Sequence, residues 1–174
     1  MPLAVADGQA PGMTIAQSRQ AAFVIALALP LALIACVYIA QYGFGLPPCE
    51  MCWWQRYGHF AAIGLALAGW ALRRSAAGTG LIALAGLAIG VSAGIGLLHA
   101  GVEYHWWTGP TACSTTRIDG DALSAILNAP LVRCDTAAWT LFGVSLAGYN
   151  FLVSSIGSLA VLVLLARGSR SPAA

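Results

Sequence analysis

Two cysteines near the start of an apolar stretch have the spacing of a redox-active pair. Cys49 and Cys52 enclose Glu50 and Met51, which makes a Cys-x-x-Cys segment. Two cysteines three positions apart can form a strained disulfide that exchanges readily with other thiols. The nucleophile in such exchange is the thiolate, and a helix N-terminus or a nearby cation lowers the pKa of a thiol. The segment therefore predicts thiol–disulfide chemistry at the start of a helix.

The other three cysteines divide into two kinds. Cys36 lies inside an apolar run, which predicts a small buried hydrophobic residue with no redox role. Cys113 and Cys134 lie in a polar segment and are 21 residues apart. Structural zinc sites usually take their ligands from two closely spaced pairs, so this separation disfavours zinc and we expect no metal site. Inert structural disulfides remain open from spacing alone.

The composition indicates that the chain lies in a membrane. Hydrophobic residues make up 59% of its 174 residues and charged residues 8%, whereas soluble domains carry about 25% charged residues. A soluble chain of this length could not hide so much apolar surface from water. The net charge is +2, and the Arg residues are scattered along the chain. No basic face of the kind that binds nucleic acid is predicted.

Four apolar runs are long enough to cross a bilayer. A run of twenty residues at 1.5 Å per residue spans a hydrocarbon core of roughly 30 Å. The sequence therefore predicts an all-α membrane protein, a bundle of four transmembrane helices. Gly86, Gly90 and Gly94 in the third run are four residues apart and predict a close contact with another helix. The expected spans are residues 21–40, 53–72, 78–98 and 146–166, between tails at residues 1–20 and 167–174.

Four crossings place both termini on one side of the membrane, and the Arg residues indicate which side. Five Arg would lie with the termini and three on the opposite side, which favours cytoplasmic termini. The loops at residues 41–52 and 99–145, with all four loop cysteines, would then face the periplasm from a bacterial inner membrane. Within the second loop, residues 121–131 predict a short amphipathic helix on the membrane surface, capped by Asp119 or Asp121.

Two polar residues share a helix face with the dithiol. Arg56 lies four residues after Cys52, and His59 lies seven residues after it. An Arg that faces other helices in a membrane is costly without a partner, and a quinone carbonyl or the Cys52 thiolate would serve. The alternative is that Arg56 extends to the lipid headgroups. His59 could donate to a quinone or form a hydrogen bond inside the bundle.

These pieces together resemble the disulfide bond formation protein B (DsbB) family over about residues 21–166. The four expected spans carry one cysteine pair in each outer loop. Any one piece is common, but their order is specific. The matching segments are Pro48-Cys49-Glu50-Met51-Cys52 followed by Gln55-Arg56, Gly109-Pro110-Thr111-Ala112 before Cys113, and Trp139, Phe142, Gly143 and Ser145 after Cys134.

The resemblance implies a membrane thiol:quinone oxidoreductase. Cys113 and Cys134 would form a shuttle disulfide that a reduced, thioredoxin-like oxidase of the DsbA type attacks, with Cys113 the expected point of attack. The electrons would pass to Cys49 and Cys52 and then to a bound quinone, by default ubiquinone, held by Arg56. The partners implied are this periplasmic oxidase, the quinone pool and membrane lipid. The family also places a polar residue near the outer end of the third span.

Three residues are candidates for the polar position near the outer end of the third span. His99 directly follows the third run, so we expect it to contact the quinone in preference to Glu103 or His105.

Two other functions are alternatives to the one that the resemblance implies. A vitamin K epoxide reductase-like enzyme is also a helical bundle, but its Cys-x-x-Cys is expected late in the chain. A transporter or a structural membrane protein would use the disulfides only as staples. No Asp or Glu falls inside an expected span, which counts against a transporter site.

Overall fold

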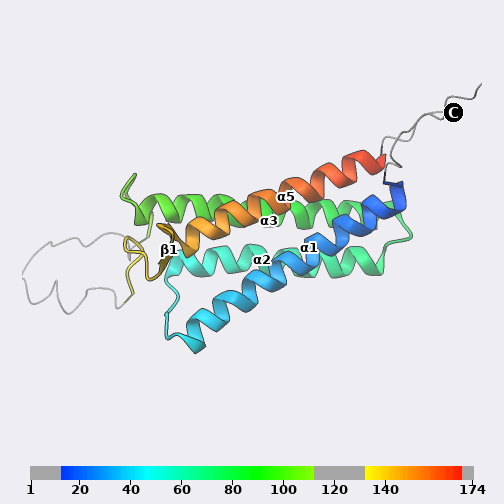
Figure 1. The fold of residues 1–174 in the computed structure, drawn as a ribbon. Helices are drawn as coiled ribbons and strands as arrows, with labels where there is room; N and C mark the ends of the chain where they lie inside the picture. Colours follow the sequence, from blue (N-terminus) through cyan, green and yellow to red (C-terminus); the bar gives the residue numbers. More distant parts are fainter. Residues whose placement is uncertain (1–12, 112–131, 170–174) are drawn as a thin grey trace, which may run out of the picture.

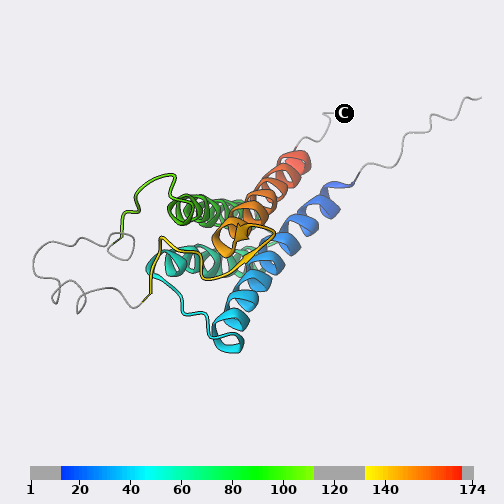
Figure 2. The ribbon, with the colours of Figure 1, turned by 60° about the vertical axis from the view of Figure 1, so that its left-hand side comes forward.

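The computed structural model describes residues 13–111 and 132–169. Four long helices lie side by side, and α1 begins at the end of the bundle where α5 ends (Figure 1). The start of α2 and a small hairpin lie at the opposite end in both views (Figures 1 and 2). The start of α2 is therefore separated from the start of α1 and the end of α5 by the length of the bundle. The helices are α1 (Ile15–Tyr38), α2 (Glu50–Ala71), α3 (Ala76–Glu103) and α5 (Leu146–Ser169).

Three stretches of helix are long and apolar enough to cross a membrane. They cover Ile15–Gly43, Ala76–Glu103 and Leu146–Arg167. The fourth helix, α2, has 22 residues but carries polar side chains in its first turns, so its crossing stays a prediction. The outer faces of the helices are lined by large apolar side chains such as Val24, Leu84 and Ile156, which are 49%, 49% and 71% exposed. Such surface suits lipid and not water.

The helix α1, taken together with the π-helical turn that follows it, extends beyond its expected span at both ends. It begins at Ile15 because Thr14 and Gln17 form a reciprocal capping box, which satisfies backbone N–H groups of the first turn. Pro30 lies inside the helix and is buried in the bundle, where a kink is tolerated. At its other end α1 continues as a π-helical turn, Ile39–Gly43. Such turns are rare and occur frequently at functional sites.

Glycines let the helices approach closely where the bundle is tightest. A Cβ on Gly58 of α2 would lie 2.9 Å from Ser92 Cβ of α3, so no other residue fits there without a shift. Gly86 and Gly90 face Val161 and Ser158 of α5 in the same way, as their spacing predicted. Gly94 has open space beside it, and Gly96 instead meets α5 at Ala147 and Asn150.

A two-stranded hairpin precedes α5. Strand β1 (Thr140–Leu141) pairs with β2 (Val144–Ser145), with Thr140 opposite Ser145. The turn residues Phe142 and Gly143 both have positive φ, at 49° and 77°, which is the geometry of a tight hairpin turn. The Tyr104 hydroxyl at the end of α3 donates to Gly143 O and accepts from Ser145 N, both at 2.9 Å. This clamp holds the hairpin against α3. The surface helix predicted for residues 121–131 lies outside the described residues.

Candidate functional site

The dithiol forms the N-terminal cap of α2. Cys49 is the N-cap residue, and its Sγ accepts a hydrogen bond from Cys52 N at 3.2 Å. The helix thus starts one residue after Cys49 and not at Cys52, the start that the sequence suggested. The two sulfur atoms lie 2.8 Å apart, and both residues are free thiols in this structure. Their proximity allows them to close into a disulfide with little movement.

The two thiols differ in acidity. The hydrogen bond with Cys52 and then burial raise the pKa of Cys49 well above its ordinary value. The same hydrogen bond lowers the pKa of Cys52, and the charge of Arg56 contributes in that direction, against burial and the charge of Glu103. Cys52 is therefore the more acidic thiol of the pair, and Cys49 keeps its proton to higher pH.

Arg56 points into the bundle and not toward the lipid headgroups. Arg56 is 5% exposed, and its Nη1 donates to Gln41 Oε1 at 2.7 Å. The guanidinium lies over the rings of Tyr38 and Trp53, 5.1 and 4.9 Å from their centroids. Gln41 belongs to the π-helical turn, so that turn positions the side chain that orients Arg56. Among the described residues Arg56 has no carboxylate partner, and its positive charge is available to a ligand.

A cavity of about 370 Å³ opens beside these residues, between α1 and the other three helices. Its wall is mainly apolar, with a few polar groups that converge on one side, as is typical of ligand pockets. Cys52, Arg56, His59, His99 and Glu103 all line it. The structure therefore brings the two sequence-predicted His residues, Arg56 and one sulfur to a common space. His105 is exposed and does not line the cavity.

His99 lies between the dithiol and Glu103. Its Nε2 is 3.5 Å from Cys49 Sγ and 3.6 Å from Glu103 Oε1. Its Nδ1 is 3.0 Å from Nε2 of Gln55. The backbone of Cys134 also lies within hydrogen-bonding reach of the ring. The position of the ring proton decides whether His99 donates to the sulfur or accepts from it.

Two buried amides settle that position. Nε2 of Gln55 donates to Met51 O at 3.1 Å, and Nδ2 of Asn150 donates to Ser92 O at 3.1 Å. Backbone carbonyls only accept, so neither amide can be reversed without losing a bond. Asn150 then donates to Gln55 Oε1 at 2.8 Å. The Gln55 nitrogen facing His99 is consequently a donor, so Nδ1 of the neutral ring accepts and Nε2 carries the proton, with Cys49 Sγ and Glu103 Oε1 3.5 and 3.6 Å away.

The same reasoning fixes the second histidine. Nε2 of His59 lies 2.9 Å from Asn150 Oδ1 and 3.0 Å from Ser92 Oγ. The Ser92 hydroxyl gives its own proton to Gln55 O at 2.9 Å, so both neighbours of His59 Nε2 accept. The proton of neutral His59 is thus on Nε2. Its Nδ1 is buried and has no hydrogen-bond partner in the described part of the chain. His59 both bonds within the bundle and lines the cavity.

The loop cysteine Cys134 lies next to the dithiol. It is fully buried, packs with Cys49, Met51 and Val102, and is disulfide-bonded. Thr111 Oγ1 lies 3.7 Å from its sulfur. Its expected partner, Cys113, lies outside the described residues, so the pairing stays a prediction. The packing brings the second loop to the entrance of α2, where exchange between the two cysteine pairs requires it.

One prediction about the cysteines is wrong. Cys36 was expected to be buried in the bundle, but it is exposed on α1 and lines the rim of the cavity. The reason is that lipid is as apolar as a protein core, so an apolar run does not tell which residues face inward. Sequence reasoning also missed Gln41, Ser92 and Asn150. Asn150, a polar side chain inside a predicted span, carried a usable signal.

A metal site can be assessed from the same geometry. The ligand atoms of Cys49, Cys52 and His99 lie within 4.8 Å of one another. Zinc would need the lone pair of His99 Nε2. That nitrogen carries the proton as long as Gln55 donates to the other side of the ring. The amide network therefore favours a hydrogen-bond donor here over a metal ligand.

The site combines a dithiol at a helix N-terminus, a disulfide-bonded loop cysteine packed on that dithiol, and a cavity beside both. In a helical membrane protein these features define the class of thiol–disulfide oxidoreductases. The family model described as "Disulfide bond formation protein DsbB" matches residues 18–165. The chain belongs to this family, whose members are membrane proteins of disulfide bond formation.

Two curated relatives carry the name "Disulfide bond formation protein B". The protein of Verminephrobacter eiseniae is 38% identical over 154 residues, which cover 80% of this chain and 82% of the relative. The protein of Acidovorax sp. (strain JS42) is 35% identical over 162 residues, with 80% of this chain and 88% of the relative covered. No solved structure matches the chain.

Proposed function

We propose that this protein reoxidises a periplasmic DsbA-type dithiol oxidase and passes the electrons through two cysteine pairs to a quinone. The observation that carries the proposal is the cavity on whose wall Cys52 and the buried Arg56 both lie. In this function α2 is the fourth transmembrane helix, both termini are cytoplasmic, and the cysteine loops face the periplasm. The membrane is the bacterial inner membrane.

The first exchange is between the partner and the loop pair. The partner dithiol gives two electrons to a Cys113–Cys134 disulfide and becomes a disulfide itself, and the expected point of attack is Cys113. The Cys134 sulfur is then free as a thiolate. Cys134 shares a buried cluster with Cys49, and we take Cys49 as the sulfur that it attacks. Thiol–disulfide exchange needs such an approach, because the attacking sulfur must reach one particular sulfur of the bond.

The second exchange uses the difference in acidity. Attack of Cys134 on Cys49 breaks the Cys49–Cys52 bond, and Cys52 leaves as a thiolate. Its lowered pKa makes Cys52 the better leaving group. Cys113 then attacks Cys134, which restores the loop disulfide and releases Cys49. The released sulfur takes up a proton, and its raised pKa together with the N–H of His99 favours that outcome.

The cavity fits a quinone head group. It is mainly apolar, and two buried polar atoms on its walls, Glu103 Oε2 and His59 Nδ1, lack a partner among the described residues. A bound quinone, ubiquinone by default, supplies an acceptor for two electrons and two protons. Arg56 would hold a carbonyl oxygen and stabilise negative charge on it. Cys52 faces the same space, so its sulfur delivers the electrons as the Cys49–Cys52 disulfide re-forms.

Anaerobic mixing tests the proposal. Purified protein is mixed with a reduced DsbA-type dithiol and a short-chain ubiquinone, and quinone absorbance is followed. We expect stoichiometric quinol formation that disappears in Cys52→Ser and persists in Cys36→Ala, which removes a cysteine from the cavity rim. Cys113→Ser should block the protein donor but retain turnover with dithiothreitol. Absence of quinone reduction in the unaltered protein refutes the proposal.

A further inference from the structure

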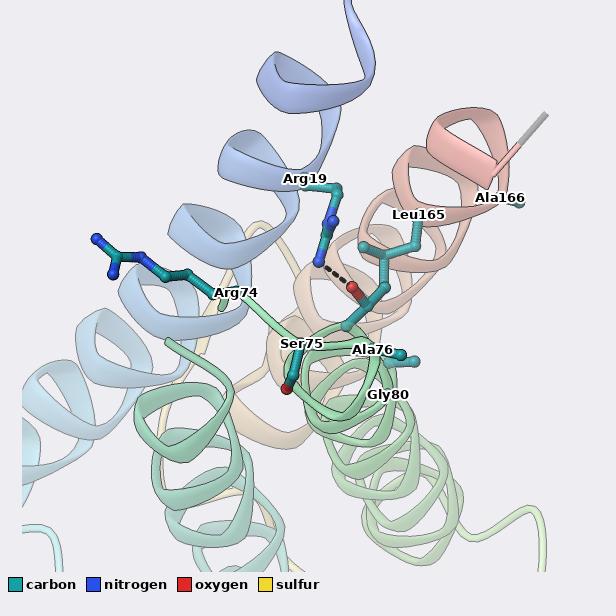
Figure 3. A pocket seen from close by; sticks show the side chains of 9 residues that line it. Arg19, Arg74, Ser75, Ala76, Gly80, Leu165 and Ala166 are labelled. Atoms are coloured by element: carbon teal, nitrogen blue, oxygen red, sulfur yellow. Dashed lines mark hydrogen bonds between the residues drawn. The ribbon is translucent and has the colours of Figure 1, made fainter. Parts of the chain in front are cut away.

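A second and larger cavity lies at the end of the bundle remote from the cysteines. Its volume is about 730 Å³. It lies where α1 and α3 begin and α5 ends (Figure 3). Gly80, Ala83 and Leu165 form an apolar part of its wall, and Arg19, Ser75 and Thr79 form a polar part. A ligand that fills it would need both an apolar portion and a polar one.

The polar part of the wall is positively charged. The Arg19 guanidinium points into the cavity and donates to the Thr79 hydroxyl (Figure 3). That hydroxyl is neutral, and a guanidinium has five N–H donors, so most of the donor capacity of Arg19 remains for a ligand. Arg74 also borders the cavity, but its side chain extends away from it in Figure 3. The ligand would therefore contact one cation directly, with a second one near by.

No described carboxylate balances this charge. The described acidic residues, Glu50, Glu103 and Asp135, belong to the cysteine end of the bundle. The remote end carries four described Arg residues, and the local partners described for two of them are neutral: Arg19 donates to Thr79, and Arg73 stacks on Trp70 at 4.5 Å. The four Arg residues are Arg19, Arg73, Arg74 and Arg167. An anion is the ligand that complements their charge.

The start of α3 adds to the attraction for an anion. Its N-cap residue, Ser75, does not cap the helix, since the hydroxyl donates to Leu72 O at 2.9 Å. The first turn of α3 contains no acidic residue, whereas the start of α1 is satisfied by its own capping box. The backbone N–H groups at the start of α3 are thus without a side-chain cap, at the positive end of a 28-residue helix.

The length of α3 places this end at headgroup depth. Its 28 residues extend for about 42 Å, compared with a hydrocarbon core of roughly 30 Å. A centred helix therefore projects about 6 Å beyond the core at each end. Ser75 and Arg19 would lie beside lipid phosphates, while Ala83 and Leu165 would lie beside acyl chains. Basic pockets between helices on the cytoplasmic side are typical sites for anionic headgroups.

We propose that this cavity binds one anionic phospholipid. The phosphodiester lies against Arg19 and the start of α3, and an acyl chain lies along Gly80, Ala83 and Leu165. The apolar wall distinguishes a lipid from a free phosphate ion, which would gain nothing from it. This inference is independent of the thiol chemistry proposed above, because no residue is shared between the two cavities.

Native mass spectrometry of the full chain in detergent tests the proposal. The protein is offered equal amounts of phosphatidylglycerol and phosphatidylcholine with the same acyl chains, and the ratio of bound lipids is measured. We expect the unaltered protein to prefer phosphatidylglycerol. Arg19→Gln should reduce that preference by about fivefold, the contribution of one Arg near an anionic surface. Arg73→Gln, the same change on the Arg that stacks outside the cavity, should keep most of it.

A second pair of variants tests the apolar wall without changing charge. Gly80 and Gly94 both lie on α3 and both have open space where a Cβ would be. Gly80→Leu places a side chain against the apolar wall where the acyl chain would lie and should abolish the preference, whereas Gly94→Leu should leave it unchanged. Circular dichroism of each variant checks that the helices are retained.

Three outcomes would overturn the proposal. One is equal binding of the two lipids by the unaltered protein. Another is an equal loss of preference in the cavity variants and in their matched controls. The third is displacement of phosphatidylglycerol by excess inorganic phosphate in both the unaltered protein and Gly80→Leu, which would identify a site for free anions.

Discussion

Replacing Gln55 by Glu should move the ring proton of His99. The side chain keeps its length, but an oxygen replaces the nitrogen that donates to His99 Nδ1 at 3.0 Å. A carboxylate oxygen accepts and does not donate. His99 should then carry its proton on Nδ1, and Nε2 should present a bare lone pair to Cys49 Sγ.

The contacts give the size of the effect. In the unaltered protein the other tautomer would lose one hydrogen bond and would leave one buried N–H facing another donor. Each of these costs about 1 kcal/mol, so the Nε2–H form is favoured by about 2 kcal/mol in total. Since 1.4 kcal/mol is a factor of ten, the ratio of tautomers is about 30 to 1. Gln55→Glu should reverse it.

Nitrogen NMR of histidine-labelled protein in micelles measures the tautomer directly. The chain has three His residues, so His105→Phe and His59→Phe suffice to assign the signals of His99. We expect a protonated Nε2 and an unprotonated Nδ1 in the unaltered protein, and the reverse in Gln55→Glu. A control, Gln55→Met, removes the donor without adding an acceptor and should show both forms.

A consequence for turnover follows if the N–H of His99 stabilises the leaving Cys49 sulfur. Loss of a hydrogen bond worth about 1 kcal/mol would slow reduction of the Cys49–Cys52 disulfide about fivefold. The reasoning is refuted if the unaltered protein carries the His99 proton on Nδ1, or if Gln55→Glu leaves the nitrogen signals unchanged.

Three further outcomes are expected. In the reduced protein Cys52, whose pKa is lowered, should be alkylated at lower pH than Cys49, whose pKa is raised; peptide mass spectrometry over a pH series measures this, and the opposite order would contradict the assignment of the thiolate. Arg56→His should raise the apparent KM for short-chain ubiquinone about tenfold, the value of roughly 1.4 kcal/mol for a charged hydrogen bond, with a smaller effect on thermal unfolding; unchanged quinone kinetics would remove Arg56 from the site. Tyr104→Phe should lower the free energy of unfolding by about 1 kcal/mol, because two hydrogen bonds of about 0.6 kcal/mol each are lost; an unchanged melting temperature would show that the hairpin needs no clamp.

The parts of the site that the sequence predicted are those built from local spacing. Cys49, Cys52, Arg56 and His59 lie within three turns of one helix, so the helical repeat alone placed them on one face. The parts that it missed depend on distant pairings. Asn150 reaches Gln55 across 95 residues of sequence, and no local pattern encodes that contact.

The fold was predictable to a similar depth. Apolar runs located the helices, because a bilayer demands long apolar segments. They did not give the rotation of each helix, which is why Cys36 was placed inside the bundle. The hairpin was missed because its turn, Phe142-Gly143, lacks the usual Asn or Asp before Gly. Tyr104 supplies the stabilisation instead.

The tight contact at Gly58 has a bioenergetic consequence. On the side of Gly58 that is remote from the cysteines, seven buried apolar residues contributed by all four helices form a layer. This layer separates the hydrogen-bonded amides of Gln55 and Asn150 from the end of the bundle that carries the four Arg residues. Such a layer offers a proton no hydrogen-bonded route to the cytoplasm through the described part of the bundle. Oxidation of a dithiol releases two protons and reduction of a quinone consumes two, so both would be exchanged on the periplasmic side. Turnover would then be electrically silent, and its rate should not respond to the membrane potential.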